Sequence, residues 1–448
     1  MKAEFWEKLY GLIEKNDPNC THVANPDPVQ NLAIGFNPAK GGERPDLVDP
    51  QPEDIERIKE AHSSFVGDLR SSDINIPYER GTRGIALTAS LEQVPVLLTS
   101  IRMIRKTKSK LPIEVFLKNR DERDDHVCDV ILPSLNAACI LLSDIFESAK
   151  IDMAISQYQF KIMPILFSSF EDVLLLDCDS FPVTDPLRVF KEEPFRSTGM
   201  IVWPDFWQAS ESPHFFEVIQ LDRDELPSLN VRASVESGQL MYSKAKHSKS
   251  IMLATYYNHY GPAYYYPLMS QGAPGQGDKE TFAWAAMVFE EPFYAVRQGV
   301  QALGRFDSKG DHLGSAMVQH NPIIDYSITK KYGTPHQRAE DPAAGLQEVV
   351  DEQEVKGEPA FVHANFPKFD PSTIFDISAP GPTRDSNGTD VRCWTGAVDS
   401  FGFDVERGFW EEIMVVACSY EHKLKTWKNK EGICDKTKNY WRNVFDKP

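Results

Sequence analysis

The 448-residue chain has little of what marks several large classes of protein. It has no apolar run near the roughly 20 residues that a membrane-spanning helix needs. It is also short of basic residues: 48 Lys and Arg stand against 66 Asp and Glu, for a net charge of −18. Such a surface repels phosphate backbones and anionic headgroups, which argues against nucleic-acid binding and against peripheral membrane binding. With 41% hydrophobic and 25% charged residues, the composition is that of a globular protein.

Cysteine is scarce as well. The seven cysteines include no Cys-x-x-Cys pair, which argues against a thiolate zinc site. Glycosylation sequons at Asn19 and Asn387 are weak evidence for a secretory compartment. In an oxidising compartment, Cys418 and Cys434 are the pair that we expect to form a disulfide.

Common catalytic motifs are missing too. The chain has no G-x-S-x-G, no H-E-x-x-H, no Walker loop and no Rossmann glycine fingerprint. Their absence removes most interpretations as a hydrolase, zinc protease, ATPase or dehydrogenase.

Three regions of the chain differ in composition and in sequence pattern. Residues 1–80 are predicted to form an irregular N-terminal arm, because the stretch 25–52 is rich in Pro, Gly and Asp. Residues 81–370 alternate between strand and helix patterns and are predicted to form the catalytic domain. Residues 371–448 are predicted to be a helical extension that packs on this domain. Within the second region, the acidic stretch 333–357 is predicted to be a surface loop.

The alternation in the second region predicts an α/β fold. Apolar runs predict strands at 84–88, 113–117, 172–176, 238–242, 315–319 and 360–362. Helical spacing predicts helices from Ser90 onward and at 124–142, 155–166, 248–260 and 278–289. Repeated β-α-β units imply a Rossmann-type, mainly parallel sheet flanked by helices.

The strongest chemical signal is a pair of carboxylates at the end of an apolar strand. Leu174, Leu175 and Leu176 lead directly into Asp177 and Asp179. Residues i and i+2 of an extended chain point the same way, so the two carboxylates project together. Ligands of α/β sheets gather at the carboxyl ends of strands, and hard oxygen ligands suit Mg²⁺ or Mn²⁺ with a diphosphate. The alternative is that the pair only solvates the end of a strand.

This Asp-x-Asp region is similar to that of nucleotide-sugar glycosyltransferases of the GT-A fold. Over roughly residues 80–370, the combination of motifs resembles the fungal Golgi α-mannosyltransferases of glycosyltransferase family 71. The motifs are Arg-Gly-Ile-Ala-Leu-Thr at 83–88, Val-Trp-Pro-Asp-Phe-Trp at 202–207, Glu-Ser-Gly-Gln-Leu-Met-Tyr at 236–242, Gly-Asp-Lys-Glu-Thr-Phe at 277–282 and Val-Gln-His at 318–320.

The resemblance implies a retaining transferase that uses Mn²⁺ and moves mannose from GDP-mannose to a mannose-containing glycan. It also implies a type II membrane protein of the Golgi lumen, of which this chain would be the lumenal part without its anchor. The likeness of 203–207 favours an α-1,2 linkage; an α-1,3 linkage or another nucleotide sugar stays open.

Several side chains are candidates for binding the donor. Arg83 precedes the first strand, where it either reaches a nucleotide phosphate or lies on the surface. Lys161 is on the helix before the Asp-x-Asp strand, where it either binds the donor or lies on the surface. Glu236 and Gln239 are assigned to the sugar of the donor. Asp278 opens a helix, so it is a helix cap, a ligand of hydroxyl groups, or both.

The remaining candidates concern the metal and the acceptor. By resemblance to the late His-containing segment of retaining GT-A enzymes, His363 is assigned to the metal and Lys368 to the leaving phosphate. The candidates for acceptor binding are Trp203, Trp207, Glu280 and His320. Each aromatic residue and each histidine could equally be a core residue.

Two other functions are considered. A glycosidase needs two carboxyl groups on opposite faces of the sugar, about 5 to 9 Å apart, whereas Asp177 and Asp179 project together. A sugar-binding module without turnover would use the same metal and aromatic residues. A test of transfer or hydrolysis separates it from an enzyme.

Overall fold

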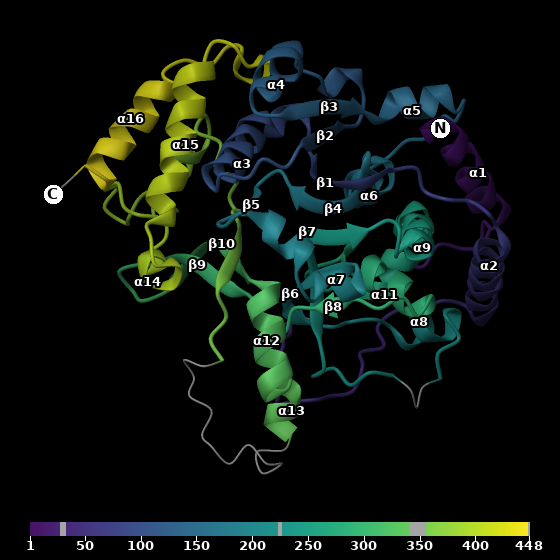
Figure 1. The fold of residues 1–448 in the computed structure, drawn as a ribbon. Helices are drawn as coiled ribbons and strands as arrows, with labels where there is room; N and C mark the ends of the chain where they lie inside the picture. The colour runs from purple at the N-terminus through teal and green to yellow at the C-terminus, as the bar shows by residue number, and fades with distance from the viewer. Residues whose placement is uncertain (27–32, 223–225, 341–354, 447–448) are drawn as a thin grey trace.

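The computed structural model describes residues 1–26, 33–222, 226–340 and 355–446 (Figure 1). Its centre is a seven-stranded sheet in the order β3-β2-β1-β4-β7-β6-β8. The strands are β1 (Glu79–Thr88), β2 (Ile113–Leu117), β3 (Ala137–Leu141), β4 (Phe170–Asp177), β6 (Met200–Gln208), β7 (Ala233–Ser243) and β8 (Tyr294–Ala295). Only the pairings of β7 with β4 and β6 are antiparallel. The predicted α/β fold with a mainly parallel sheet is confirmed.

Helices cover both faces of this sheet. In Figure 1, α6 (Ile162–Phe167), α9 (Ser248–His259) and α11 (Lys279–Val288) lie to its right, and α3 (Val94–Lys106) and α15 (Val405–Tyr420) lie to its left. The alternation along β4 explains how one strand serves both layers. Val173 and Leu175 join the core on one face, and Leu174 and Leu176 join the core on the other.

A second, antiparallel sheet lies at the carboxyl end of β4. It has the order β5-β11-β10-β9, with β5 (Ser180–Pro182), β9 (Gln301–Phe306), β10 (His312–His320) and β11 (Pro359–His363). The strand β5 begins three residues after β4 ends, and its Ser180 pairs with His363. The short connection therefore carries the end of β11 to the end of β4.

The N-terminal region is more ordered than its composition suggests. The expectation of an irregular arm over residues 1–80 is wrong for α1 (Lys2–Lys15) and α2 (Pro52–Ser71), whose apolar stripes join the core. Charged residues interrupt these stripes, so the helical period was missed. The described part of 25–52 is irregular apart from a bridge between Gly35 and Trp207, and residues 27–32 lie outside the described ranges.

The helical stretch predicted at 124–142 is confirmed for residues 125–134 and wrong for residues 137–141. The chain forms a π-helical turn at Val127–Ile131 and the single turn α4 (Leu132–Ser134), and then enters β3. Residues 137–141 form a strand because they pair in register with β2. A disulfide that was not predicted, Cys128–Cys139, closes this segment.

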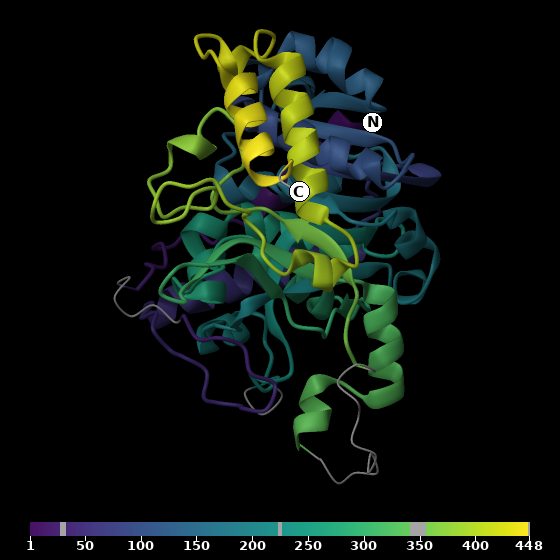
Figure 2. The same cartoon turned by 90° about the vertical axis from the view of Figure 1, so that its left-hand side faces the viewer.

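The predicted disulfide Cys418–Cys434 is confirmed; it joins α15 to α16 (Ile433–Val444) in the C-terminal region. These two helices lie in front of the sheet in Figure 2. Of the predicted loop 333–357, the first part contains α13 (Pro335–Glu340), and residues 341–354 are not among those described. Within the described ranges, no helix combines the length and apolar character needed to cross a bilayer.

Candidate active site

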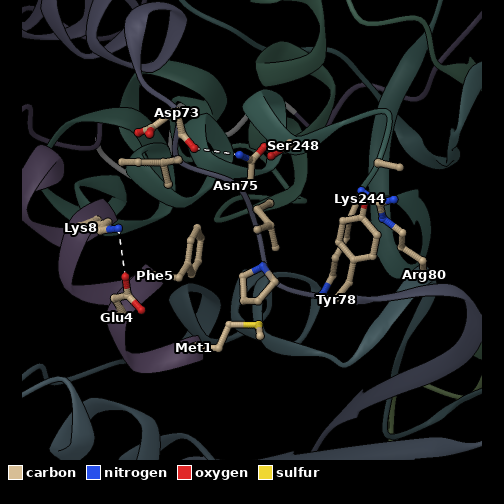
Figure 3. Close-up of a pocket in the computed structure, with 14 residues that line it drawn as sticks. Met1, Glu4, Phe5, Lys8, Asp73, Asn75, Tyr78, Arg80, Lys244 and Ser248 are labelled. Atoms are coloured by element: carbon tan, nitrogen blue, oxygen red, sulfur yellow. Dashed lines mark hydrogen bonds and ion pairs between the residues drawn. The ribbon is translucent and has the colours of Figure 1, made fainter.

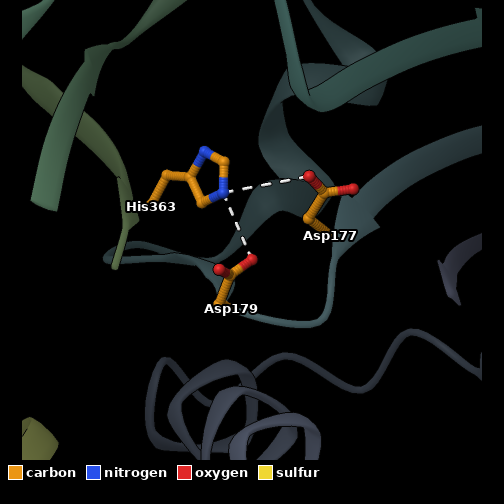
Figure 4. A group of neighbouring side chains, drawn as sticks. All are labelled: Asp177, Asp179 and His363. Carbon is orange, nitrogen blue, oxygen red and sulfur yellow. Dashed lines mark hydrogen bonds and ion pairs between the residues drawn. The ribbon is translucent and has the colours of Figure 1, made fainter. Parts of the chain in front are cut away.

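Three predicted metal ligands meet where the two sheets touch. One side-chain donor atom from each of Asp177, Asp179 and His363 lies within 4.8 Å of the other two. The imidazole Nε2 of His363 is 3.2 Å from Asp179 Oδ1 and 3.8 Å from Asp177 Oδ2 (Figure 4). Asp179 and His363 are buried, and Asp177 is partly open. Two carboxylates and one imidazole are a donor set that suits Mn²⁺.

The backbone next to His363 leaves room for the imidazole ring. A Cβ at Gly238, on β7, would lie 2.4 Å from His363 Nδ1, so only glycine leaves room for the ring. This glycine therefore admits the histidine ring to the sheet. Nδ1 of the same ring lies 3.5 Å from Glu236 Oε1, which orients the imidazole.

Two lysines flank the carboxylates. Lys161 donates to Asp177 Oδ2 at 3.1 Å and to Ser237 Oγ at 2.9 Å. Lys368 forms an ion pair with Asp179 from the other side, and its side chain remains 45% exposed. Both predicted cations are therefore at the site, and Lys368 has access to solvent and to a ligand.

Glu236 and Gln239 are internal to the site. Glu236 Oε2 accepts hydrogen bonds from the backbone N–H of Gly238 and from Gln239 Nε2, both at 2.9 Å. Because Glu236 is buried and committed to these donors, it holds His363 and Gln239 in place and is not poised as a nucleophile.

Asp278 caps α11 only by position, since its side chain makes no cap hydrogen bond. Its Oδ2 is buried, has no hydrogen-bond partner in the described chain, and lies 4.0 Å from Lys161 Nζ. Burial raises the pKa of Asp278. A buried acceptor without a partner beside the cluster suits a hydroxyl group of a substrate.

The electrostatics of the cluster favour a dication. Burial opposes the charged forms of Asp179 and Glu236, but His363 and neighbouring lysines outweigh it and lower the pKa of both carboxyls. In the same way Asp179 and Glu236 overcome the burial of His363 and raise its pKa to about 10. The imidazole thus carries a proton that a metal ion would displace.

The charges of this cluster can be counted. Among the described residues, ion pairs connect five carboxylates to three ammonium groups; the carboxylates are those of Asp177, Asp179, Glu236, Asp278 and Asp205. The ammonium groups are those of Lys161, Lys279 and Lys368. With a neutral imidazole, the cluster carries a net charge of −2, which one divalent cation balances.

Asp205 and Lys279 were missed as site residues. Lys279 forms an ion pair with Asp205 and lies 4.0 Å from Glu236 Oε1. The signal in the sequence was that both residues belong to motifs on which the family resemblance rests. In those motifs only aromatic and acidic residues were considered as site candidates. The pair extends the cluster toward β6.

Two predicted charged residues lie elsewhere. Arg83 pairs with Asp172, five residues before Asp177 on the neighbouring strand, so it is roughly 16 Å from the cluster. Glu280 is buried, forms an ion pair with Arg232 at 2.8 Å and accepts the N–H of Val235. Both have structural partners, and neither faces the metal ligands.

The predicted acceptor residues are also largely internal. Trp203 is buried, and its indole N–H donates to the carbonyl of His320 at 2.9 Å. His320 pairs with Pro359 at the opposite end of β11 from His363, and burial lowers its pKa to about 4. Trp207 is half-buried at the end of β6, beside Gly35. The structure therefore buries Trp203 next to Glu236 and places His320 at the far end of β11 from His363.

Comparison with known proteins relates this chain to mannosyltransferases. The family model described as "Mannosyltransferase putative" matches residues 82–233 and 224–321. The chain is 31% identical over 438 residues to the alpha-1,2-mannosyltransferase MNN21 of Candida albicans, covering 87% of this chain and 66% of that protein. It is 30% identical over 447 residues to the alpha-1,2-mannosyltransferase MNN2 of Saccharomyces cerevisiae, covering 88% and 73%.

A likeness to solved structures is weaker. The glycosyltransferase GlyE of Streptococcus pneumoniae matches 48% of this chain and 45% of its own, at 13% identity and a TM-score of 0.32. At that score the likeness supports no argument about the site.

Proposed function

The chain belongs to this mannosyltransferase family, and from that premise we propose that it is a retaining α-mannosyltransferase that moves mannose from GDP-mannose to a mannose-containing glycan. The proposed linkage is α-1,2, as in the names of the relatives. The observation that carries the proposal is the convergence of Asp177, Asp179 and His363, with Lys161 and Lys368 beside them.

These three side chains would hold Mn²⁺. A divalent cation there supplies Lewis acidity that neutralises the diphosphate leaving group. Lys368 is positioned to exchange its bond with Asp179 for one with a phosphate oxygen, because its side chain is partly exposed. Lys161 fixes the direction of the Asp177 carboxylate.

The buried Oδ2 of Asp278 would accept a hydrogen bond from a hydroxyl group of the donor sugar or of the acceptor. Asp177 and Asp179 face His363, and Glu236 is committed to Gly238 and Gln239, so none of these three carboxylates is placed as a nucleophile on the sugar. Retention then requires the acceptor to attack from the face that GDP leaves, with a phosphate oxygen taking the proton.

The same geometry argues against the competing functions. Asp177 and Asp179 converge on one imidazole nitrogen, so they cannot lie on opposite faces of a sugar as glycosidase carboxylates do. A binding module without turnover would not need a lysine ready to meet a leaving phosphate.

The proposed location is the Golgi lumen, with an anchor of type II. Support comes from the two disulfides, because such bonds persist in the oxidising compartments of the secretory pathway.

The test is a donor screen with Mn²⁺ and an α-mannoside acceptor, followed by NMR analysis of the linkage and anomer. We expect transfer from GDP-mannose to give an α-1,2-linked product. Preferential transfer from a UDP-sugar would reject the donor, a β-linked product would reject retention, and an α-1,3 product would reject the linkage.

A further inference from the structure

A cavity of 380 Å³ opens where β2 and β3 end. Lys118 and Asn119 follow β2 directly, and Ser143, Phe146 and Glu147 lie on α5 (Leu142–Ser148), which follows β3. The irregular segment 150–155 forms the opposite wall. None of these residues belongs to the metal cluster.

The lining combines an apolar floor with unused polar groups. Phe146, Ile151, Met153 and Ile155 supply the apolar surface. The Ser143 hydroxyl is buried and has no hydrogen-bond partner within the described residues. Among the residues that the structure describes, neither Lys118 nor Lys150 forms an ion pair. An apolar surface beside a few polar groups is typical of a small-molecule site.

The position of the cavity relates it to the metal cluster. The residue Phe116 on β2 pairs with Thr88 on β1, which pairs with Asp177 on β4. Two strand spacings of about 4.8 Å place the end of β2 roughly 10 Å from Asp177 along the same sheet edge. The far wall continues through a 3₁₀ turn at Gln157–Phe160 to Lys161, which contacts Asp177.

We infer that this cavity binds the guanine base of the sugar nucleotide, an inference that rests on the proposed function. A span of about 10 Å suits the ribose and diphosphate between a base and a metal-bound phosphate. The Watson–Crick edge of guanine offers two donors, N1–H and the 2-amino group, and the carboxylate of Glu147 is the acceptor that reads both. Lys118 and Lys150 supply donors to O6 and N7.

The larger cavity in Figure 3, of 550 Å³, does not fit this role. It is lined by Tyr78 and Arg80 at the start of β1 and by Lys244 at the end of β7. Those residues lie at the amino edge of the parallel strands, the whole length of β4 away from Asp177. A nucleotide bound there could not reach the metal ligands.

Calorimetric titration of the protein with Mn²⁺ and either GDP or inosine diphosphate tests the inference. Inosine diphosphate lacks the 2-amino group, so the wild type should bind it more weakly. Glu147→Gln should weaken GDP binding about tenfold and reduce the preference for GDP over inosine diphosphate. Asp144→Asn is the matched control: Asp144 lies on the same helix, is exposed and contacts the same Arg120, but does not line the cavity.

A second variant tests the cavity without touching a charge. Met153→Trp fills it from the irregular wall, and we expect GDP binding to fall at least tenfold while Mn²⁺ binding alone is unchanged. Wild-type GDP affinity in both Glu147→Gln and Met153→Trp would overturn the base site and leave the proposed function standing. If the wild type with Mn²⁺ binds neither GDP nor UDP, the proposed function and this inference both fail.

Discussion

Two lysines at opposite ends of β4, Lys161 and Lys244, have very different surroundings. At the carboxyl end, Asp177, Asp278 and Glu236 outweigh the burial of Lys161 and raise its pKa. At the amino end, Lys244 donates only to the carbonyls of Leu166 and Ser168, and burial lowers its pKa well below the usual value. The first lysine is one of several concentrated charges, whereas the second is a structural donor. The comparison indicates that charge is gathered at the edge where a metal ion and a diphosphate would bind.

The largest effect is expected at Asp179. Asp179→Asn removes a ligand and a charge from the cluster, so turnover with saturating Mn²⁺ should fall by a factor of about 10³ or more. Circular dichroism should show that the fold is kept. Turnover within tenfold of the wild type would mean that the carboxylate only solvates the strand end.

Exchanging each lysine for methionine tests the comparison itself. Lys161→Met should lower kcat/KM about 10²-fold, because Asp177 loses its partner at the reacting centre. Lys244→Met should leave kcat/KM within twofold and cost about 1 to 3 kcal/mol of stability, since two carbonyls lose their donor. Equal losses of activity in the two variants would break the contrast between the ends of the strand.

The carboxyl group of Glu406 is buried far from the cluster, and it should make the stability of the protein depend on pH. Burial raises the pKa of Glu406, on α15, from 4.5 to about 7. Because the folded pKa is raised, its contribution to stability is complete below pH 4.5 and is lost as the pH rises through 7. From pH 4.5 to 7.5 the wild type should lose roughly 3 kcal/mol relative to Glu406→Gln. Parallel thermal unfolding midpoints of the two proteins across that range would show that Glu406 does not titrate as described.

The smallest effect is expected at Arg83. Its guanidinium pairs with Asp172 near the amino end of the strands, and that ion pair is partly exposed. Arg83→Ala should therefore change KM for the donor by less than twofold and stability by about 1 kcal/mol at most. A tenfold rise in KM would return Arg83 to the donor site.

The sequence predicted the local features of this site better than the distant ones. The strand before Asp177 and the shared direction of the two carboxylates follow from apolar runs and the two-residue period. Helix order and family resemblance singled out Lys161, His363 and Lys368, and the structure places all three beside the two carboxylates. Which roles they play in catalysis stays a prediction.

The sequence-based predictions failed where tertiary packing determines the position of a residue. Trp203 was given to the acceptor because an aromatic side chain looks the same in sequence whether it packs or binds, and the structure buries it. Arg83 was given to the donor because spacing along a strand does not show which end a residue faces. The strand β3 was taken for a helix, since its pairing with β2 is not visible in the chain.

The central claim is that the cluster at the end of β4 holds a divalent cation, and two histidines, His363 on β11 and His320 on β10, test it most directly. Mn²⁺ titration in the presence of GDP should show at least a tenfold loss of metal affinity in His363→Ala. His320→Ala, equally buried but paired with Pro359, should bind Mn²⁺ as the wild type does. Equal Mn²⁺ affinity in the wild type, His363→Ala and His320→Ala would contradict the claim.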